Sequence, residues 1–515
     1  MPRKENEDGD SVSLLAIDMG SSSCKAVAFA LDGRILAEQS HSYSPEIPQP
    51  SWAEMPALAF WHALGTVTRG IANTVPEDPI EVLSISSHAE TFVPVNEQLQ
   101  PVGPAILNID NRAVAQANWI AEALGSRHIF EVTGLAVHPM YPVPKILWMR
   151  EHQREIFRSA AKFLGVVDYL ITRLGLPPCI DYSLASRFLA FDIRQKRWSA
   201  DMLSACELTS DRLATPVPAG TVVGQLASSV ARELGLQAGT SVVVGGHDQP
   251  CAALGLGVVD PGRVSASLGT YECLLAASAA PAINDAAYGA NLNTYCHVVP
   301  DRYVTLAYFP SGIMLEWLLH LLYRERVDST SSVGERCAAL EARAPAGPSG
   351  LCITPHLLGT CNPDFNPYAT GVMVGLRPET GASHIYKGII EGIACELRHM
   401  TELLQRVTGS FDDLYVTGGG CHSALGLELR AALTGCRLHR MRCPEAVCLG
   451  KAILAGVGAG KYSGFPEAIA QLVKVADTIH PNHEIADGYR LQLQQYQLLY
   501  SSLANVRDVS AAKVS

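Results

Sequence analysis

The chain has 515 residues, more than the ~250–300 residues that one hydrophobic core usually supports, so two domains are expected. Hydrophobic residues make up 48% of the chain and charged residues 17%, which is ordinary for a soluble globular protein. The net charge of −11 argues against nucleic acid as the main partner, because phosphate binding requires a basic surface.

The N-terminus and the cysteines indicate where the protein works. The first residues, MPRKENEDGDSVS, are polar and lack the apolar core of a signal peptide. No run of about 18 apolar residues predicts a membrane span. The 14 cysteines are scattered without C-x-x-C pairs, which indicates reduced thiols. A cytoplasmic protein without membrane partners is therefore expected.

The first predicted elements are three short strands that follow a polar tail, residues 1–12. LLAID predicts a buried strand, CKAVAFAL alternates, and RILAEQSHSY follows Asp32-Gly33, which is a strong hairpin signal. Helical periodicity then predicts helices over residues 56–75, 111–125 and 145–164.

Farther along the chain, the strand TSVVV leads into GGHDQPCAALGLG, so that Asp248 lies between a strand and a closely packed helix. Residues 262–278 then repeat the opening pattern of strand, tight turn and strand, which predicts an internal duplication. We therefore expect an N-terminal domain over 13–258 and a C-terminal domain over 259–515. Helices over 383–409 and 448–460 enclose FDDLYVTGGGCHSALGLELRAALTG, a strand, a glycine turn and a helix. The alternation predicts an α/β architecture.

Three turns at predicted strand ends are candidates for phosphate binding. DMGSSSCK places Asp18 before a tight turn and Lys25 after it, a pattern that suits a magnesium-bound nucleotide. ASLGTYE and VTGGGCHS provide two more such turns. A P-loop is excluded because Ala455 and Tyr462 replace required residues, and Ser423 breaks the dinucleotide pattern.

The combination resembles the FGGY family of carbohydrate kinases, and is most similar to the xylulose kinases and at some positions to the glycerol kinases. The resemblance covers about residues 13–500. It rests on ordered motifs: DMGSSSCK, NIDNR, VTGL, PKILW, GGHDQPCAALGLG, SASLGTYE, TGGGCHSALGLELRAALTG and EAVCLGKAILAGVGAG. It implies two actin-like (ribonuclease H-like) domains with a cleft between them. The sugar would lie on the N-terminal domain and ATP largely on the C-terminal domain.

The resemblance also implies roles for individual residues. Asp248 would be the general base that takes the proton from the attacking sugar hydroxyl, which suits a carboxylate beside a poor nucleophile. Asp18 would help to hold Mg²⁺. The substrate would be bound by Glu90, Asp110, Asp248 and Gln249. The nucleotide would be bound by Asp18, Ser21, Ser22, Lys25, Gly269, Thr270, Gly312, Glu316, Gly419 and Ser423.

Several departures from the family pattern fall on the sugar side. Glu90 stands where xylulose kinases have a histidine, and Ala89 stands where glycerol kinases have an arginine. Asn108 replaces a tryptophan, and GTCNPDFNP (359–367) replaces an E-R-T-P segment; Ser21 stands where the first turn commonly has threonine. Because ionised Glu90 and Asp110 can only accept hydrogen bonds, a neutral polyhydroxy substrate is expected, with sugar acids such as gluconate being poor.

The predicted reaction is therefore the ATP-dependent phosphorylation of a hydroxyl of a small neutral sugar or polyol, with a pentulose such as xylulose favoured. A glycerol or other polyol kinase is an alternative, although Ala89 argues against glycerol. A protein of another class, an actin-like nucleotide switch without kinase activity, would need the first two phosphate turns but neither Asp248 nor Asp110. The predicted partners are the sugar, ATP and Mg²⁺, without nucleic acid, and a homodimer is left open.

Overall fold

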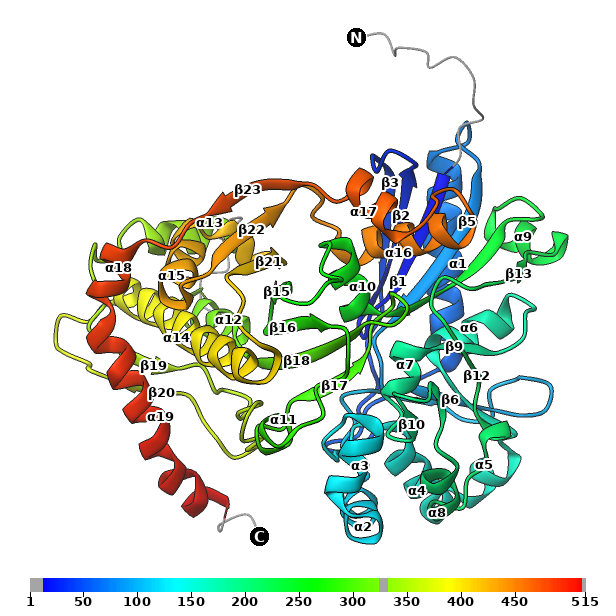
Figure 1. Ribbon diagram of the computed structural model, residues 1–515, viewed down its shortest axis with the longest axis horizontal. Helices are drawn as coiled ribbons and strands as arrows, with labels where there is room; N and C mark the ends of the chain where they lie inside the picture. The colour runs from blue at the N-terminus through cyan, green and yellow to red at the C-terminus, as the bar shows by residue number, and fades with distance from the viewer. Residues whose placement is uncertain (1–12, 324–331, 512–515) are drawn as a thin grey trace.

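A computed structural model describes residues 13–323 and 332–511, with side chains up to residue 503. Figure 1 shows two lobes, each built on one mixed sheet with helices around it. We call them the first lobe, whose sheet contains the N-terminal strand, and the second lobe. The predicted polar tail lies outside the described residues.

The first sheet has six strands in the order β13-β14-β5-β1-β2-β3. The N-terminal strands form an antiparallel meander, as the Asp32-Gly33 signal predicted, and β1 then pairs in parallel with β5, which pairs in parallel with β14. The bounds are β1 Ser13–Met19, β2 Ser23–Ala30, β3 Ile35–Ser42, β5 Ile80–Ser87, β13 Val222–Gln225 and β14 Ser241–His247.

The second sheet repeats this plan. Its order is β17-β18-β16-β15-β21-β22-β23: an antiparallel meander ends at β15, β15 pairs in parallel with β21, β21 pairs in parallel with β22, and the last strand is antiparallel. The bounds are β15 Val264–Leu268, β16 Tyr271–Ser278, β17 Asn293–Cys296, β18 Tyr303–Pro310, β21 Asp413–Thr417, β22 Arg437–Met441 and β23 Val475–Ile479. The matching topologies agree with the expected internal duplication.

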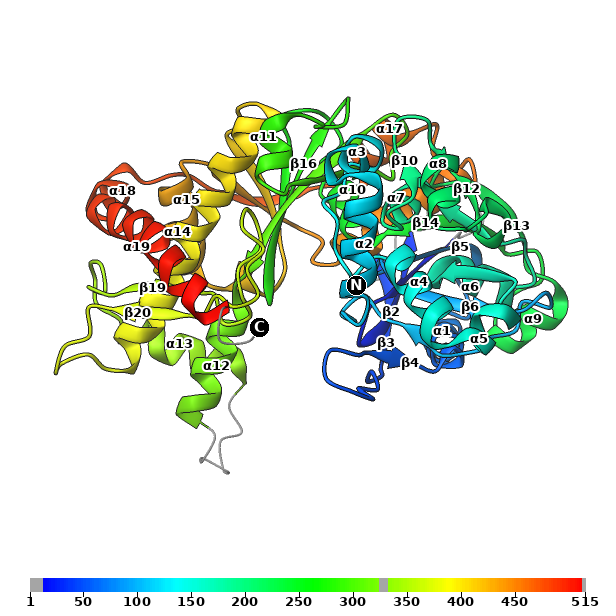
Figure 2. The same ribbon diagram turned by 90° about the horizontal axis from the view of Figure 1, so that it is seen from below.

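Two helices lie between the sheets and contact each other closely. Helix α10 (Asp248–Gly255) and helix α16 (Ala446–Gly458) cross at glycines, since a Cβ on Gly450 would lie 1.9 Å from the Cys251 carbonyl oxygen. A Cβ on Gly255 would likewise lie 2.0 Å from the Ala446 carbonyl oxygen. Figures 1 and 2 both place α10 between the two sheets. Only glycine at these positions allows the backbones to approach so closely.

Helix α16 and the following α17 (Phe465–Leu472) belong to the C-terminal half of the chain but pack on the first sheet. Their apolar residues share one core cluster with Leu14, Val27 and Val243. Figure 1 shows both helices beside β1, β2 and β3. The last part of the chain then returns to the second lobe through β23.

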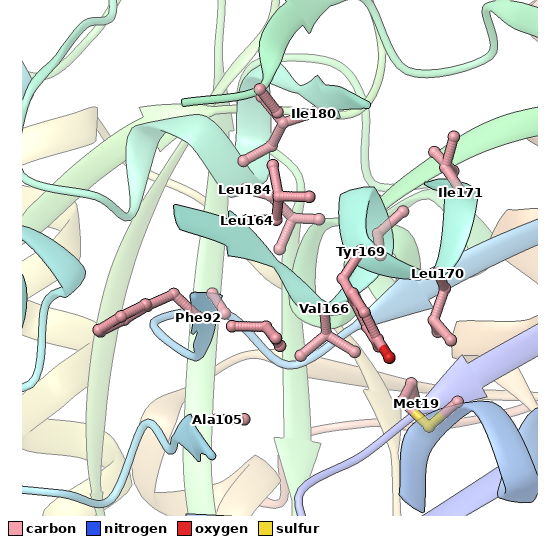
Figure 3. Packing of buried hydrophobic residues seen from close by; sticks show 14 of the residues in the cluster. Met19, Phe92, Ala105, Leu164, Val166, Tyr169, Leu170, Ile171, Ile180 and Leu184 are labelled. Carbon is pink, nitrogen blue, oxygen red and sulfur yellow. The ribbon is translucent and has the colours of Figure 1, made fainter. Parts of the chain in front are cut away.

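The first lobe carries an additional small sheet with the order β4-β7-β6-β8. The large hydrophobic core of the first lobe includes residues of helix α6 (Val166–Arg173). Figure 3 shows Val166, Tyr169 and Leu170 of that helix near Met19. The strands of this small sheet are β4 Glu54–Met55, β6 Phe92–Val95, β7 Ala105–Ile106 and β8 Lys162–Gly165. Two separate strand pairs are β9 Cys179–Asp181 with β12 Thr215–Val217, and β10 Phe191–Asp192 with β11 Arg197–Trp198.

Most predicted helices are present with shifted ends. The prediction of one helix over 145–164 is wrong: the chain forms α4 (Pro142–His152), α5 (Arg154–Ser159) and then β8. The cause is tertiary, since residues 162–165 pair with β6. Other helices are α1 Ala57–Thr74, α2 Val114–Leu124, α3 Ser126–Thr133, α7 Tyr182–Ser186, α8 Ala200–Ala205, α9 Ser228–Leu234, α11 Asp285–Gly289, α12 Gly312–Tyr323, α13 Val333–Glu341, α14 Ala382–Thr408, α15 Ala424–Thr434, α18 His483–Gly488 and α19 Arg490–Ala511.

Candidate active site

Asp248 lies where β14 ends and α10 begins, as the sequence predicted. Its Oδ1 accepts a hydrogen bond from the Gln249 backbone N–H at 2.6 Å and lies 3.1 Å from Nε2 of His247. Among the described residues, no group is within hydrogen-bonding distance of Oδ2. Burial by itself would raise the pKa of Asp248, but the hydrogen bond and attraction of His247 hold it below its usual range. The residue is thus an ionised carboxylate with one oxygen fixed and one oxygen available.

Asp18 lies at the end of β1, with its Oδ1 held by two groups from other elements. Ser86 Oγ at the end of β5 donates a hydrogen bond at 2.8 Å, and Lys451 Nζ of α16 lies at 3.1 Å. Lys451 is fully buried, and although burial acts to lower its pKa, the Asp18 charge raises the pKa above its usual value. A lysine from the C-terminal half therefore balances the charge of an N-terminal aspartate.

The turn after Asp18 is fixed through its carbonyl groups. The Tyr43 hydroxyl donates to the Gly20 carbonyl oxygen at 2.5 Å and lies 3.2 Å from that of Ser23. Ser21 is partly exposed and Ser22 is exposed between them. Lys25 pairs with Glu445 at 2.7 Å, and it lies opposite Asp18 in the β1–β2 register. With its carbonyls occupied, the turn keeps an exposed edge that suits an anion.

The second lobe brings its three predicted glycine segments together at one end of its sheet. Gly269 and Thr270 form the turn between β15 and β16, and the Gly312 N–H donates to the Gly269 carbonyl at 3.1 Å. A Cβ on Gly312 would lie 2.6 Å from that oxygen, so glycine is required there. Thr270 Oγ1 lies 3.4 Å from Glu316 Oε1. The turn at residues 418–420 packs against Leu268, next to the same hairpin.

A cavity of about 600 Å³ lies at the start of α15, the helix that follows the turn at residues 418–420. Ser423 caps α15 by accepting from the Gly426 N–H, and its hydroxyl also lies 3.2 Å from Glu341 of the cavity wall. Lys387 holds another part of the wall by donating to the Gly347 carbonyl oxygen at 2.8 Å. The cavity is lined by Glu341, Ala344, Pro345, Ala346, Lys387, Ala424, Leu425, Glu428, Ile479, His480 and Asn482.

Glu90 lies on the loop after β5 and is not an uncompensated carboxylate. Arg187, at the C-terminal end of α7, donates from Nε to Glu90 Oε1 at 2.5 Å, and both side chains are buried. The assignment of Glu90 to the substrate stays a prediction, but sequence reasoning did not include its partner Arg187. The reason is a long-range contact that sequence spacing does not show.

Asp110 is fully buried, and both of its oxygens have partners. Oδ2 accepts from the Ala53 N–H at 2.6 Å and from Arg112 Nη2 at 2.7 Å, while Oδ1 accepts from the Arg112 N–H at 3.0 Å. The Arg112 guanidinium lies over the Trp52 ring, with Cζ 3.9 Å from its centroid. These contacts give Asp110 a structural role, and its assignment to the sugar stays a prediction.

Sequence reasoning missed four buried residues of the candidate site: Arg187, His247 and Tyr295 near Glu90 and Asp248, and Lys451 beside Asp18. His247 directly precedes Asp248 in GGHDQ, so its position alone could have singled it out. Arg187 and Tyr295 carry no local signal, because they are brought in by α7 and by β17 of the second lobe. Three of these side chains lie side by side. The Arg187 Cζ is 5.0 Å from the centroid of the Tyr295 ring, and that centroid is 5.6 Å from the centroid of the His247 ring.

Family comparison identifies the chain. The model of the N-terminal domain of the FGGY family of carbohydrate kinases matches residues 13–255, and that of its C-terminal domain matches residues 264–459. The protein belongs to the FGGY family of carbohydrate kinases. It is a xylulokinase-like sugar kinase with the two-domain actin-like fold of that family.

Individual relatives cover nearly the whole chain. A gluconokinase of Bacillus subtilis (strain 168) is 25% identical over 484 residues, 93% of this chain and 93% of that protein. A xylulose kinase of the same organism is 25% identical over 509 residues, 97% of this chain and 98% of that protein. The crystal structure of xylulose kinase from Rhodospirillum rubrum superposes with a TM-score of 0.86 at 23% identity, covering 96% of this chain and all of that chain.

Within the described residues, no helix is both long and apolar enough to cross a membrane.

Proposed function

We propose that the protein transfers the γ-phosphoryl group of ATP to a hydroxyl of a small neutral sugar or polyol, a pentulose such as xylulose being favoured. The observation that carries the proposal is the geometry of Asp248, whose Oδ1 is fixed by Gln249 and His247 while Oδ2 remains available. A carboxylate of this kind can orient an alcohol and accept its proton.

The step balances without further reactants. Asp248 Oδ2 takes the hydroxyl proton, the sugar oxygen forms a bond to the γ-phosphorus, and the bond from that phosphorus to the β-phosphate oxygen breaks. ADP and a sugar phosphate leave. General-base catalysis of this type typically contributes about 10²–10⁴-fold to the rate. The carboxylate is ionised at neutral pH, because its pKa lies below the usual range.

The residues around Asp18 fit a magnesium ion that arrives with the nucleotide. Asp18 Oδ1 is engaged by Ser86 and Lys451, which leaves its other oxygen for a metal-bound water. Mg²⁺ usually keeps several waters and needs only one or two carboxylates beside the phosphates. The ion would supply neutralisation of phosphate charge. Lys451 would keep Asp18 ionised and oriented.

The second lobe offers the surface for the nucleotide. Its three glycine segments, at residues 269–270, 312 and 418–420, converge at one sheet end, and the 600 Å³ cavity lies along the start of α15. We place the phosphates at the turns and the adenosine toward the cavity. We also propose a division of the chain after residue 258, with α16 and α17 contributed to the first lobe by the C-terminal half.

The acceptor itself is inferred from charge. The relatives include a gluconokinase and a xylulose kinase, each 25% identical, so their names do not select between acidic and neutral sugars. The Glu90–Arg187 pair makes the wall near Asp248 close to neutral, which supports a neutral acceptor.

The experiment is ADP formation from ATP and Mg²⁺ with xylulose, ribulose, xylitol, glycerol, gluconate and no acceptor. We expect xylulose or another neutral pentulose to stimulate ADP release and to yield a sugar phosphate. A slow ATPase that no acceptor stimulates would refute the kinase proposal and favour an actin-like switch. If glycerol were the preferred acceptor, the proposed substrate would be a polyol and not a pentulose.

A further inference from the structure

We propose that the buried Glu90–Arg187 pair determines the charge of the acceptor: Glu90 occupies the guanidinium of Arg187, and without Glu90 the site would bind a sugar acid through Arg187. This inference rests on the proposed function and names the residue that sets its substrate class. Arg187 is assigned as a specificity-determining residue, and no motif of the sequence pointed to it.

The pair is enclosed in the protein. The Arg187 and Glu90 side chains are only 4% and 6% exposed, and Nε and Oε1 are 2.5 Å apart. The guanidinium also lies between two aromatic rings, with its Cζ 5.2 Å from the Tyr141 centroid and 5.0 Å from the Tyr295 centroid. In such surroundings neither charge is solvated by bulk water, so each depends on the other.

Glu90 is held in an unusual backbone conformation. Its φ is +61°, which costs a residue other than glycine on the order of 1–3 kcal/mol. Lys145 stabilises this conformation, because its buried Nζ donates hydrogen bonds to the Glu90 carbonyl oxygen at 2.8 Å and to the Leu107 carbonyl oxygen at 2.7 Å. Two buried basic side chains thus position one glutamate: Lys145 binds its backbone carbonyl oxygen, and Arg187 binds its carboxylate.

Unpaired polar atoms connect this pair to the base. Among the described residues, Arg187 Nη1, Tyr295 Oη and His247 Nδ1 are buried without a hydrogen-bond partner. The residues that carry these atoms form a continuous row: the Arg187 guanidinium lies beside the Tyr295 ring, that ring lies beside the His247 ring, and His247 Nε2 lies 3.1 Å from Asp248 Oδ1. Buried polar atoms left unpaired are costly, and a polar ligand beside Asp248 would offer them partners.

The donor pattern explains the selectivity. Arginine binds carboxylates through paired N–H groups with charge assistance, and in the native protein Glu90 already takes this place. A neutral sugar oxygen can still accept from Nη1, whereas a sugar carboxylate would find the positive charge of Arg187 already neutralised by Glu90. Replacing Glu90 with glutamine removes the competing charge but keeps the shape of the side chain, so Arg187 becomes free to bind an anionic acceptor.

The test compares wild type with Glu90→Gln, using xylulose as the neutral acceptor and gluconate as the acidic one. We expect Glu90→Gln to raise the ratio of kcat/KM for gluconate to that for xylulose by roughly 100-fold, since the new charge-assisted bond to gluconate and the weaker binding of xylulose are each worth about tenfold. Without ATP, gluconate should raise the melting temperature of Glu90→Gln and leave that of the wild type unchanged.

Further variants test whether Arg187 is the cation that binds gluconate. The double variant Glu90→Gln/Arg187→Gln should lose the gain toward gluconate, because its pocket has no charge to offer. Glu90→Asp, which keeps the charge but loosens the pair, should show a smaller rise than Glu90→Gln and serves as the second variant if Glu90→Gln does not fold. Arg212→Gln is the matched control, since Arg212 also stacks on rings, those of Phe157 and Phe163, and should leave the ratio unchanged.

The outcomes separate this inference from the proposed function. An unchanged ratio in Glu90→Gln, the same rise in the double variant, or a wild type that prefers gluconate would overturn the inference. A wild type that phosphorylates no acceptor would refute the proposed function, while the melting-temperature measurements with gluconate would still decide whether Arg187 binds a carboxylate.

Discussion

At the scale of residues, the candidate active site depends on how single oxygens are occupied. Asp18 and Asp248 each have Oδ1 engaged by neighbours, which fixes the orientation of the carboxylate and leaves the second oxygen for chemistry. Asp110 differs because both of its oxygens are engaged by Arg112 and by the backbone. The contacts thus distinguish two aspartates with an available oxygen, for which we propose chemical roles, from one whose oxygens are both used within the structure.

Asp248→Asn tests the base. Asparagine keeps the size of the side chain and can keep the contact with the Gln249 N–H, but it cannot take the hydroxyl proton. We expect kcat to fall about 10²–10⁴-fold, while the binding of sugar and ATP is largely retained. Asp413→Asn is the control, because Asp413 pairs with Arg437 and His439 in the second lobe, away from the glycine turns. A variant that keeps more than about a tenth of the wild-type kcat would exclude Asp248 as the base.

Residue-level prediction from the sequence succeeded where the signal was local. Asp248 after a buried run and Gly269 in a tight turn are recognisable because strand, turn and helix signals occur within a few positions. The Arg187–Glu90 contact was not predictable, because 97 residues separate the partners and α7 has only five residues, too few for periodicity. Whether Glu90 is a free charge or a paired one depends entirely on that contact.

At the scale of elements, the helix that begins at Asp248, the proposed base, is in close contact with a second helix. Helix α10 begins at Asp248, and α16 carries Lys451, which contacts Asp18. Their crossing at Gly255 and Gly450 brings the two backbones into contact. The sequence predicted α10, α16 and the small residues of α10. It could not predict that the two helices cross each other, because the residues at the crossing are about 200 positions apart in the chain.

Gly450→Ala tests this crossing. The added methyl group would lie 1.9 Å from the Cys251 carbonyl oxygen, so the helices must separate. We expect a loss of roughly 1–3 kcal/mol in unfolding free energy, typical of overpacking. Because the displacement is next to Asp248 and Lys451, kcat should fall as well, as a steady-state assay with a melting curve would show.

Gly334→Ala is the matched control for this variant. Gly334 is exposed in α13, and the nearest atom to an added Cβ would be Ser332 Oγ at 3.9 Å. Its replacement should leave stability unchanged or raise it by about 1 kcal/mol or less, as expected for a helix position. If Gly450→Ala behaved like Gly334→Ala, the close crossing would have no energetic role.

At the scale of the whole molecule, the duplicated sheets place the proposed acceptor groups on the first lobe and most of the proposed nucleotide groups on the second. Glu90 and Asp248 belong to the first lobe and the three glycine segments to the second, while Asp18 is a proposed nucleotide-side group that the first lobe contributes. The α/β class and the two-domain organisation were predictable from the repeated hairpin. The contact between β17 and the first lobe was not predictable from the sequence. In this contact the Thr294 N–H donates to the Gly134 carbonyl oxygen at 2.9 Å.

Closure of the lobes is the corresponding prediction. Substrates held on opposite lobes would bring the lobes together, which excludes water from the reacting groups. Small-angle scattering should give a smaller radius of gyration with xylulose and a non-hydrolysable ATP analogue than with either ligand alone. The same radius in a sample shown to be saturated with both ligands would contradict the closure.

The return of α16 and α17 to the first sheet has a consequence for unfolding. The apolar residues of α16 and α17 complete a core whose other members are Leu14, Val27 and Val243. Neither half of the chain can therefore melt while the other stays intact, because separating them would expose this core to water. Calorimetry of the ligand-free protein should show one heat-absorption peak, with equal calorimetric and van't Hoff enthalpies. Two resolved peaks would mean that the halves are thermodynamically independent despite their shared core.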